Sequence, residues 1–396
     1  MFKKRKKILI VTGSRSEYDL LKPLILEFKK NKNFKTKIVV TGSHLSKRYG
    51  YTYKKILNDK IKIDKKINLN IKSDNKIDLI NHFTIGLKKF FNYLKYIKPD
   101  LLIVLGDRYE IFSFVVSSYI LNIPVAHIHG GELTQGAIDE GFRHSITKMS
   151  QLHFVSHEEY KKRVIQMGEN PKSVFCTGSL GVQNIVNAKF LEKKQLEKKI
   201  NINLKGNVLI VSYHPETILQ SSTSSQFNEL LQAIKYFKNI KFIFTSPNAD
   251  PGNNTIIAMI KKFVKENTNA FYITSFGQSL FFSCINYSDG MIGNSSSGII
   301  EIPAFKKGTI NIGKRQEGRI KSSSVIDVPC KRKKIILSIK KLYSKKFQKK
   351  LKTTNNPFFK KNTAKVIVSV VKKKLIRRIN VNKKFFDLNF RLNKWN

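Results

Sequence analysis

The chain alternates between short apolar runs and longer amphipathic stretches from its first residues onward. The runs lack polar residues at alternate positions, as is typical of strands in a parallel sheet that helices cover on both faces. The amphipathic stretches repeat apolar residues every three or four positions and predict helices between these strands. In the first half we expect strands at 8–12, 37–41, 63–71, 101–105, 125–128, 152–155 and 174–177, and helices at 18–30, 77–97, 111–121, 135–150 and 158–167.

A charged, glycine-poor segment at 184–205 separates this series from a second one, and we place a domain boundary there. Beyond it we expect strands at 208–212, 241–245, 270–274, 290–292, 309–312 and 325–328, and helices at 226–237, 256–266 and 279–287. The pattern predicts an α/β protein of two Rossmann-like domains with a cleft between them. We expect the domains at 1–184 and 185–370, and a basic, aromatic tail at 371–396 that could pack back on the first domain.

Length and composition agree with two ordinary cores. A chain of 396 residues exceeds what one core usually supports, and no apolar run approaches the roughly 20 residues that span a bilayer. The basic N-terminus turns into a Gly-Ser loop after a short apolar run, which indicates a first strand and not a signal peptide. Three cysteines without a paired spacing indicate neither a disulfide framework nor a structural zinc. We expect a cytoplasmic protein with no membrane partner.

The formal net charge of +47 would ordinarily suggest nucleic acid or an anionic surface. Almost all of the excess is lysine spread along the chain, and no RNP, zinc-finger or basic-zipper pattern accompanies it. We interpret the charge as a solvated surface and expect no specific nucleic-acid partner, although nonspecific binding at low salt would follow from it. A basic field also favours an anionic substrate.

Ionisable side chains gather after two strands predicted in the first half. They are Asp107, Arg108 and Glu110 after the strand at 101–105, and His127, His129 and Glu132 at the end of the strand at 125–128. Ligands of such sheets bind beyond the carboxyl ends of the strands. The pattern therefore predicts an active site that includes Asp107, His129 and Glu132.

Two features near this cluster have simpler explanations. His127 and His129 alternate on one strand and should point to the same face, a spacing that also occurs in metal sites. No further ligand motif accompanies them, so we expect no metal. Asp139 and Arg143 lie one turn apart on the next predicted helix, and structural pairing alone could explain them.

The stretch GSRSEYDLL at 13–21 follows the first strand and opens a helix. A turn at a helix N-terminus presents backbone N–H groups to an anion, and Arg15 could add a charge-assisted contact to phosphate. A simple helix cap by Ser14 or Ser16 explains the same residues equally well. Neither a dinucleotide fingerprint nor a P-loop occurs in the chain.

The stretch GNSSSGIIEIP at 293–303 repeats this arrangement in the second half. Ser295 and Ser296 could cradle a diphosphate at the helix N-terminus, and Glu301, about one turn further, could hold a ribose diol. The simpler explanation is a serine-capped helix with Glu301 as a first-turn acid. We favour binding, because the motif recurs at equivalent positions of the two halves.

Two further loops of the second half carry polar residues. SYHPET at 212–217 places His214 and Glu216 after a predicted strand, where a histidine could neutralise phosphate or hold substrate. GKRQEGR at 313–319 offers Arg315 and Arg319 as further phosphate or base contacts.

Taken together, these motifs resemble the hydrolysing UDP-N-acetylglucosamine 2-epimerases, most closely the bacterial branch that makes N-acetylmannosamine for sialic acid. The resemblance runs in order to about residue 329 and is carried by GSRSEYDLL, TGSHLS, VLGDRYE, AHIHGGE, DEGFRHSITKMS, EEYKKRVIQMGE, SYHPET and GNSSSGIIEIP. It implies a glycosyltransferase-B-like fold and a reaction without any cofactor: elimination of UDP to a 2-acetamidoglucal, then addition of water with inversion at C2. We also expect a homo-oligomer.

The resemblance implies acid–base roles for Asp107 and Asp139. The UDP contacts that it implies are Arg15, His214, Ser295, Ser296, Glu301 and Arg315. One departure concerns His129, where many members of the family carry a glutamate. Either His129 takes over the proton transfer, which suits a histidine near neutral pH, or Glu132 substitutes for the missing carboxylate. We favour His129.

Three alternatives stay open within the resemblance. A relative could act on UDP-N,N′-diacetylbacillosamine, a 4-acetamido-6-deoxy sugar, and a few sugar contacts at C4 and C6 would decide between the two substrates. A glycosyltransferase for a UDP-sugar could share the fold. A UDP-sugar sensor without activity is the third alternative.

Overall fold

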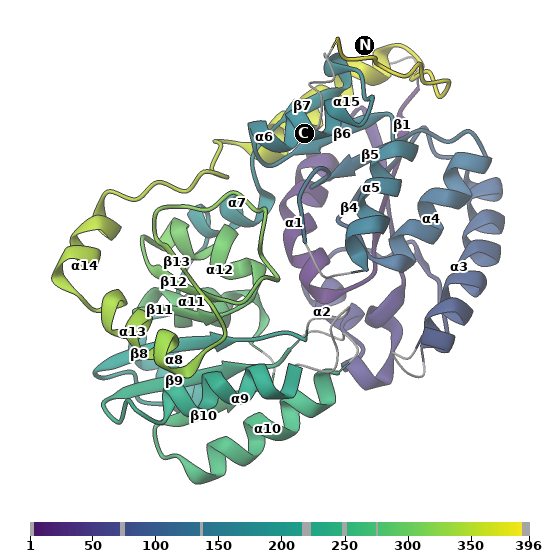
Figure 1. Ribbon diagram of the computed structural model, residues 1–396. Helices are drawn as coiled ribbons and strands as arrows, with labels where there is room; N and C mark the ends of the chain where they lie inside the picture. Colours follow the sequence, from purple (N-terminus) through teal and green to yellow (C-terminus); the bar gives the residue numbers. More distant parts are fainter. Residues whose placement is uncertain are drawn as a thin grey trace. The chain divides into compact units, whose positions relative to one another are not determined.

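The computed structural model describes residues 4–71, 76–134, 138–215, 223–247, 252–274 and 276–389. The chain divides into two compact units, and each is built on one parallel sheet (Figure 1). Unit 1 comprises Met1–Glu132, Asp139–Leu180 and Lys360–Asn396, and unit 2 comprises Leu133–Ile138 and Gly181–Phe359. None of the described helices combines the length and the apolar character needed to span a bilayer.

The described sheet of unit 1 has the strand order β3-β2-β1-β4-β5-β6-β7, with every pair parallel. Its strands are β1 (Lys6–Thr12), β2 (Phe34–Val40), β3 (Lys65–Lys66), β4 (Leu101–Leu105), β5 (Val125–Ile128), β6 (Leu152–Val155) and β7 (Val174–Cys176). Leu105 at the end of β4 pairs with Ile128 at the end of β5. The residues that follow these two strands therefore begin at the same edge of the sheet.

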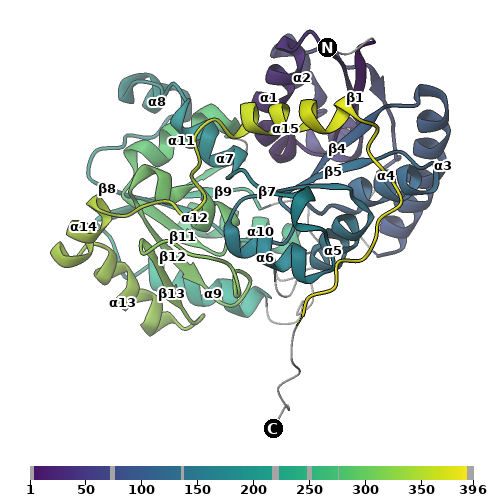
Figure 2. The same ribbon diagram turned by 90° about the horizontal axis from the view of Figure 1, so that it is seen from above.

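Helices cover both faces of this sheet (Figure 2). They are α1 (Arg15–Lys30), α2 (Tyr53–Asn58), α3 (Lys76–Ile97), α4 (Tyr109–Ile120), α5 (Asp139–Met149), α6 (Glu158–Gln166) and α15 (Thr363–Ile376), with short 3-10 helices η1 (Gly42–Leu45), η2 (Lys47–Tyr49) and η3 (Pro171–Ser173). Successive residues of a strand point to opposite faces. Accordingly, Ile8 and Ile10 of β1 belong to a core with α1 and α15, whereas Leu9 and Val11 belong to a core with α3 and α4.

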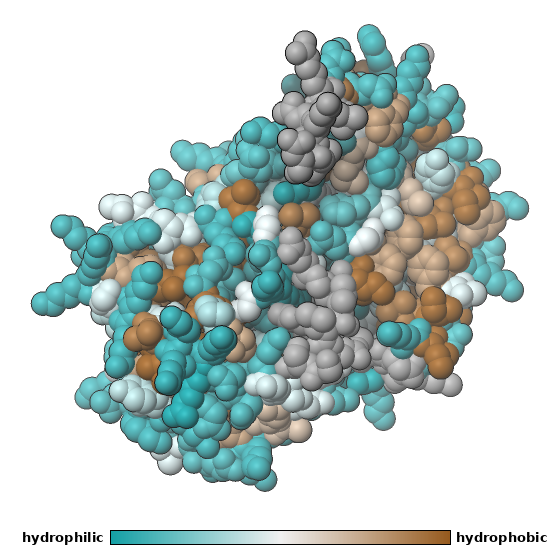
Figure 3. Space-filling view, viewed as in Figure 1, coloured by the Kyte–Doolittle hydropathy of each residue, from teal (hydrophilic) through white to brown (hydrophobic). Residues whose placement is uncertain are grey.

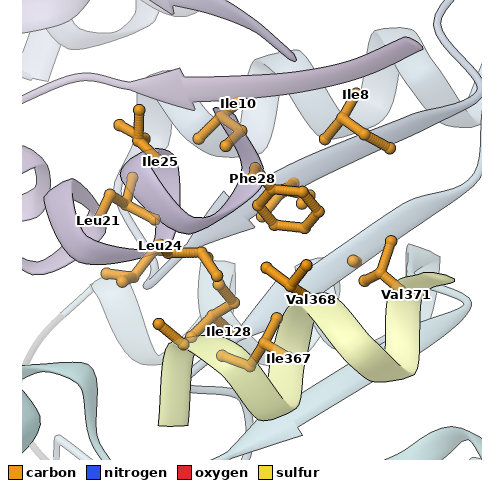
Figure 4. Close-up of a cluster of buried hydrophobic side chains, with 14 of the residues drawn as sticks. Ile8, Ile10, Leu21, Leu24, Ile25, Phe28, Ile128, Ile367, Val368 and Val371 are labelled. Carbon is orange, nitrogen blue, oxygen red and sulfur yellow. The ribbon is translucent and has the colours of Figure 1, made fainter. Parts of the chain in front are cut away.

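The helix α15 shows that the chain returns to unit 1 after completing unit 2. Its buried residues Ile367, Val368 and Val371 pack against Leu24 and Phe28 of α1 and against β1 (Figure 4). The boundaries expected from the sequence ran to residue 370 for the second domain, but the return begins at Lys360. The reason is this apolar face, which completes the core beside α1.

Beyond α15 the described tail has no helix or strand and follows unit 1 to residue 389 (Figure 2). The backbone N–H of Phe386 donates to the carbonyl of Gly168 at 2.9 Å. The ammonium of Lys383 lies 2.6 Å from Glu169, whose carboxylate also accepts from Lys148 and from His153. These buried polar contacts hold the tail near the ends of α5 and α6.

Unit 2 repeats the α/β design with the strand order β10-β9-β8-β11-β12-β13, again parallel throughout its described part. The strands are β8 (Asn207–Ser212), β9 (Ile240–Thr245), β10 (Ala270–Ile273), β11 (Gly290–Gly293), β12 (Gly308–Ile312) and β13 (Val325–Val328). The helices are α7 (Leu180–Val186), α8 (Lys193–Ile200), α9 (Thr223–Ile234), α10 (Asn253–Glu266), α11 (Gly277–Tyr287), α12 (Ser296–Ile300), α13 (Arg332–Leu342) and α14 (Lys345–Lys352), with the 3-10 helix η5 (Ile302–Phe305).

The largest difference from the expected elements concerns the run at 63–71. Only Lys65 and Lys66 form a strand there, β3, at the edge of the sheet. Ile67 and Leu69 are buried in the core beside α3, and Asn70 has a positive φ of 58°. The apolar residues of this segment therefore indicate burial in the core. They do not indicate strand pairing along its whole length.

Candidate active site

Asp107 and Arg143 link two strand ends of unit 1. Asp107 follows β4, and its carboxylate is paired with the guanidinium of Arg143 on α5. Arg143 is 3% exposed, and its second terminal nitrogen donates to the carbonyl of Glu132 at 2.9 Å. The sequence interpretation considered Arg143 only as a helix partner of Asp139. The structure adds the contacts that fix the Asp107 carboxylate beside the segment after β5.

His129 and Glu132 form a buried pair after β5. The Nδ1 atom of His129 lies 3.0 Å from Oε1 of Glu132, and the hydroxyl of Ser156 donates to the same oxygen at 2.9 Å. The Nε2 atom of His129 is buried and has no hydrogen-bond partner among the described residues. A carboxylate on one ring nitrogen selects the tautomer whose other nitrogen is a free base. The pair therefore has the form of an oriented general base.

The expectation that His127 and His129 both lie on one strand is wrong. The strand β5 ends at Ile128, and His129 has a left-handed φ of 68°, so the alternation of the strand does not extend to it. His127 bonds the carbonyl of Gly106 at 2.8 Å and the hydroxyl of Thr147 at 3.1 Å. Burial lowers its pKa to about 3, which makes it a neutral structural residue. No cluster of three metal-ligating side chains occurs among the described residues.

Asp139 is the first residue of α5 and is partly exposed. Burial lowers the pKa of Arg108, but the adjacent Glu110 and the charges of Tyr109 and Asp139 outweigh that effect, so the net shift is upward. Asp139 is thus within electrostatic reach of the β4–α4 turn that carries Asp107. We expected a helix at 135–150. Its first three residues, 135–137, are not among the residues that the structure describes, and the described helix begins at Asp139.

The turn that carries Arg15 is a self-capped helix N-terminus. Ser14 is the N-cap of α1, and its hydroxyl accepts from the backbone N–H of Glu17 at 3.4 Å. The Glu17 carboxylate accepts from the backbone N–H of Gly13 at 2.7 Å. Two N–H groups of the predicted anion site are thus bound by the protein itself. Arg15 is half-buried in the first turn of α1, so the helix-cap interpretation describes the backbone of this turn.

Asn294 organises the strand ends of unit 2. Its side-chain oxygen accepts from the backbone N–H of His214 at 2.7 Å, and its side-chain nitrogen donates to the carbonyl of His214 at 2.9 Å. Its own carbonyl accepts from Arg315 at 3.1 Å and from Gln316 at 2.9 Å. Asn294 therefore brings together the loops after β8, β11 and β12, which carry three of the predicted UDP contacts.

Gly293 explains why the loops after β8 and β11 can lie so close. A Cβ atom built on Gly293 would lie 1.9 Å from the carbonyl oxygen of Ser212, and its φ is 141°. No side chain fits in that space, so a substitution here would force the two strand ends apart.

The helix after Gly293 is shorter than the sequence suggests. Ser295 is the N-cap of α12, which ends at Ile300, and its hydroxyl lies 3.4 Å from the backbone nitrogen of Ser297. Ser296 begins the helix and is partly exposed. Glu301 is the C-cap of α12 and the residue before η5, so it is not the first-turn acid of the simpler explanation.

His214 is buried and neutral. Burial lowers its pKa to about 3, and the positive charge of Arg315 adds to the effect. The ring is therefore a hydrogen-bonding group at pH 7, and the positive charge of this loop cluster resides on Arg315. Glu216 of the same motif lies outside the described residues. The guanidinium of Arg319 donates to the carbonyl of Leu133 at 2.5 Å and to the hydroxyl of Thr134 at 2.7 Å, so it is bonded to the segment after Glu132.

The structure thus groups the predicted residues within each unit. Asp107, His129 and Glu132 lie at adjacent strand ends of unit 1, and Arg143 ties two of these segments together. Sequence reasoning did not identify Asn294 as the centre of the second group. Its place between Gly293 and the serine cap was the available signal, because an asparagine there can bond a neighbouring backbone in both directions.

The chain is similar to several known proteins. Residues 26–372 match the family model described as UDP-N-acetylglucosamine 2-epimerase. The polysialic acid biosynthesis protein P7 of Escherichia coli is 42% identical over 97% of this chain and 98% of its own length. The GDP/UDP-N,N′-diacetylbacillosamine 2-epimerase (hydrolyzing) of Campylobacter jejuni is 41% identical over 82% of this chain and 84% of its length.

A solved structure shows the fold. The UDP-GlcNAc 2-epimerase from Neisseria meningitidis, crystallised with UDP-GlcNAc, matches with a TM-score of 0.79 and 21% identity over 93% of this chain and all of that chain. The expected fold of two parallel-sheet α/β domains, glycosyltransferase-B-like, is confirmed.

Proposed function

Because the chain belongs to the UDP-N-acetylglucosamine 2-epimerase family, we propose that it converts UDP-N-acetylglucosamine and water to N-acetylmannosamine and UDP. The product would serve the biosynthesis of sialic-acid-type sugars, in keeping with the name of the relative from Escherichia coli. The observation that carries the proposal is the pair of strand ends in unit 1, where Asp107 is fixed by Arg143 and His129 by Glu132.

The reaction has two stages that need opposite proton transfers. In the first, a base removes the C2 proton while the bond from C1 to the UDP oxygen breaks, which leaves a 2-acetamidoglucal and UDP. In the second, a proton returns to C2 from the opposite face and water adds at C1, so the product is the 2-epimer. A proton at C2 beside an amide nitrogen is not acidic, so departure of UDP must lead and its negative charge must be stabilised.

We assign the proton transfers to unit 1. Asp107, Asp139 and His129 are the acid–base groups, because each lies at or just beyond the end of β4 or β5 or at the start of α5. His129 acts through Nε2, and Glu132 acts through His129 by holding Nδ1. His129 and Glu132, the two alternatives for the missing carboxylate, therefore act together as one pair. General acid–base catalysis of this kind contributes roughly 100- to 10,000-fold.

We assign the UDP contacts to Arg15 and to the loops around Asn294. The proposed set is Arg15, His214, Ser295, Ser296, Glu301 and Arg315. Arg15 and Arg315 would meet the phosphates, and the neutral ring of His214 would donate a hydrogen bond to an oxygen of the leaving group. Glu301 would accept from the ribose diol. Proton transfers need only side chains, and we propose that no cofactor takes part.

Product analysis by NMR in deuterated water tests the reaction. UDP-N-acetylglucosamine, incubated with the enzyme and no acceptor, should give stoichiometric UDP and N-acetylmannosamine with deuterium at C2. Unlabelled product would refute the elimination route, and intact donor would refute the epimerase and favour a glycosyltransferase or a sensor. Activity that survives chelation would exclude a hydrolytic metal.

A second candidate substrate is UDP-N,N′-diacetylbacillosamine. The observation that favours it is the 41% identity to the relative named for that activity. Competition between the two UDP-sugars at equal concentration, read as the ratio of kcat/KM values, would separate them. A ratio above about 100 in favour of the diacetylated sugar would replace the first proposal, since that ratio is about 2.7 kcal/mol of transition-state binding.

We also propose that the enzyme is a cytoplasmic homo-oligomer. Hydrophobic side chains gather on the side of unit 1 that α3 forms (Figure 3), where Ile77, Ile80 and Tyr96 are between 61% and 85% exposed. Light scattering after gel filtration should give a mass at or above twice the 45.6 kDa of one chain. A monomeric mass at micromolar concentration would contradict the oligomer.

A further inference from the structure

Two carboxyl groups are buried behind the turn that carries Arg15. Glu17 on α1 is 5% exposed, and Glu110 on α4 is fully buried. Each has one oxygen, Oε1 of Glu17 and Oε2 of Glu110, that is buried without a hydrogen-bond partner in the described part of the chain. Unpartnered carboxylate oxygens in a core are costly when the group is charged. The reaction proposed above uses neither group.

Both carboxyl groups meet Gly13. Oε2 of Glu17 accepts from the Gly13 backbone N–H at 2.7 Å. A Cβ atom on Gly13 would lie 2.7 Å from Oε1 of Glu110, and one on Gly42 would lie 2.8 Å from the same oxygen. Glu110 therefore occupies the space that two glycines leave open. The two carboxyl groups connect the turns after β1, β2 and β4, which are neighbouring strands.

The cation Arg108 is bonded to Glu110. The Nε atom of Arg108 donates to Oε1 of Glu110 at 2.6 Å, and the charge of Asp139 also acts on this arginine. His44, which faces the turn from η1, adds no charge, because burial lowers its pKa to about 3. Arg15 begins the same helix as Glu17 and is half-buried.

Burial raises the pKa of Glu17 to about 8, and the neighbouring charge of Glu110 also raises it. The hydrogen bond from the Gly13 N–H and the charge of Arg108 lower the pKa, but they do not outweigh burial. Glu17 therefore carries a proton at neutral pH. A protonated carboxyl still accepts the Gly13 N–H, and it avoids a second negative charge beside Glu110.

We propose that Glu17 is a positioning residue that works in its protonated form: with Glu110 it holds the turn from Gly13 to Arg15 in the conformation that binds the UDP part of the substrate. This assignment rests on the proposed function for the identity of the ligand. Ionisation of Glu17 would place two negative charges on one glycine turn and loosen it. The binding-competent fraction would then fall as pH rises through 8.

The expected size of the effect follows from the fraction of protonated Glu17. If only that form binds, KM is proportional to 1 + 10^(pH − 8). KM should therefore rise about 30-fold between pH 7 and 9.5. The turnover number should change little, because Glu17 does not touch the reacting atoms.

Glu17→Gln and Glu17→Ala separate the protonated role from a structural one. The amide of glutamine keeps an acceptor for the Gly13 N–H and replaces the acidic O–H by N–H, so Glu17→Gln should have a KM that stays flat to pH 9.5. Glu17→Ala loses the acceptor and should raise KM about 10-fold at every pH, which the glutamine variant rescues. Glu27→Gln is the matched control, because it removes one charge from the same helix at a partly exposed site beside Lys30. It should keep the wild-type pH profile.

A measurement without substrate distinguishes this inference from the proposed function. Because the folded-state pKa of Glu17 is raised, the folded protein binds more protons than the unfolded one between about pH 4.5 and 8, so this group lowers the free energy of unfolding as pH rises through that window. Glu17→Gln should remove this part of the pH dependence of the free energy of unfolding, and Glu27→Gln should leave it in place. Equal pH dependence of stability and of KM in the wild type and Glu17→Gln would overturn the inference, and so would a glutamine variant as impaired as the alanine variant.

Discussion

The carboxyl ends of the two sheets carry different kinds of polar contact. In unit 1 the contacts join ionisable side chains to one another, as between Asp107 and Arg143 or between His129 and Glu132. In unit 2 the central contacts join one neutral side chain, Asn294, to backbone groups. The same architecture therefore places ionisable chemistry at one sheet and a backbone scaffold at the other.

This difference fits the two tasks of the proposed reaction. Proton transfer needs groups whose protonation state and orientation are set in advance, and buried pairs provide both. Holding a diphosphate needs loops fixed at a constant spacing, so that a few donors meet its oxygens. Changes at these pairs of unit 1 should therefore act on kcat, and changes around Asn294 should act on the affinity for UDP.

The largest effect is expected from Asp107→Asn. The substitution keeps the size of the side chain but removes the charge and the acid–base function, so kcat should fall roughly 1,000-fold while the dissociation constant of UDP changes less than about threefold. Steady-state kinetics and calorimetry with UDP measure the two quantities. A loss of UDP affinity with an unchanged kcat would reverse the assignment of the two units.

Asp100→Asn is the matched control for this change. Asp100 precedes β4, at the opposite end of the strand, where it accepts from the backbone N–H of Lys7 at 2.7 Å and lies 3.3 Å from the ammonium of Lys6. It should lower stability without a specific effect on kcat.

The next effect concerns the couple of His129 and Glu132. His129→Ala should lower kcat roughly 100-fold, and Glu132→Gln roughly 10-fold, because the glutamine no longer fixes the tautomer of the ring. If Glu132 acts through His129, the double variant should be no slower than His129→Ala alone. Additive losses would mean that each residue transfers its own proton. Glu169→Gln, in the buried pair of Glu169 and His153, is the control and should affect stability only.

Much of the fold follows from local pattern. The bounds of β4, β5, β6 and β13 agree with the predicted runs, because buried parallel strands are uninterrupted apolar segments between turn residues. The place of α15 does not follow in this way. Its partner α1 lies more than 300 residues earlier, and an amphipathic helix does not specify which core it will cover.

The candidate site divides along the same line. The rule that ligands bind at strand ends identified Asp107, His129 and Glu132 as a group. The contact of Arg143 with Asp107 joins residues 36 positions apart, and the pairing of His129 with Glu132 depends on a positive φ at a non-glycine residue. Neither a long-range ion pair nor a left-handed histidine has a sequence pattern of its own.

A smaller effect is expected in unit 2 from Asn294→Ala. It leaves the N–H and the carbonyl of His214 without their partner and frees the loop after β8, so the dissociation constant of UDP should rise about 10-fold and kcat should stay within about threefold. Asn311→Ala is the control, because Asn311 is also buried in this sheet but bonds Asp327. If Asn311→Ala weakens UDP binding equally, the effect reflects stability of the sheet and not the scaffold around Asn294.

The smallest effect is expected from His214→Gln, and it tests whether unit 2 acts without titration. The folded-state pKa of His214 is about 3, below the ordinary value of 6.5, so the folded protein binds fewer protons than the unfolded one between these values. Its contribution to stability is therefore constant above pH 6.5 and is lost as pH falls from 6.5 to 3. Between pH 6.5 and 8.5 the UDP affinities of wild type and variant should follow parallel curves, separated by less than about 10-fold, because a neutral donor replaces a neutral donor. Curves that converge as pH rises would show that the bound state uses a histidine cation, and unit 2 would then share the charged chemistry of unit 1.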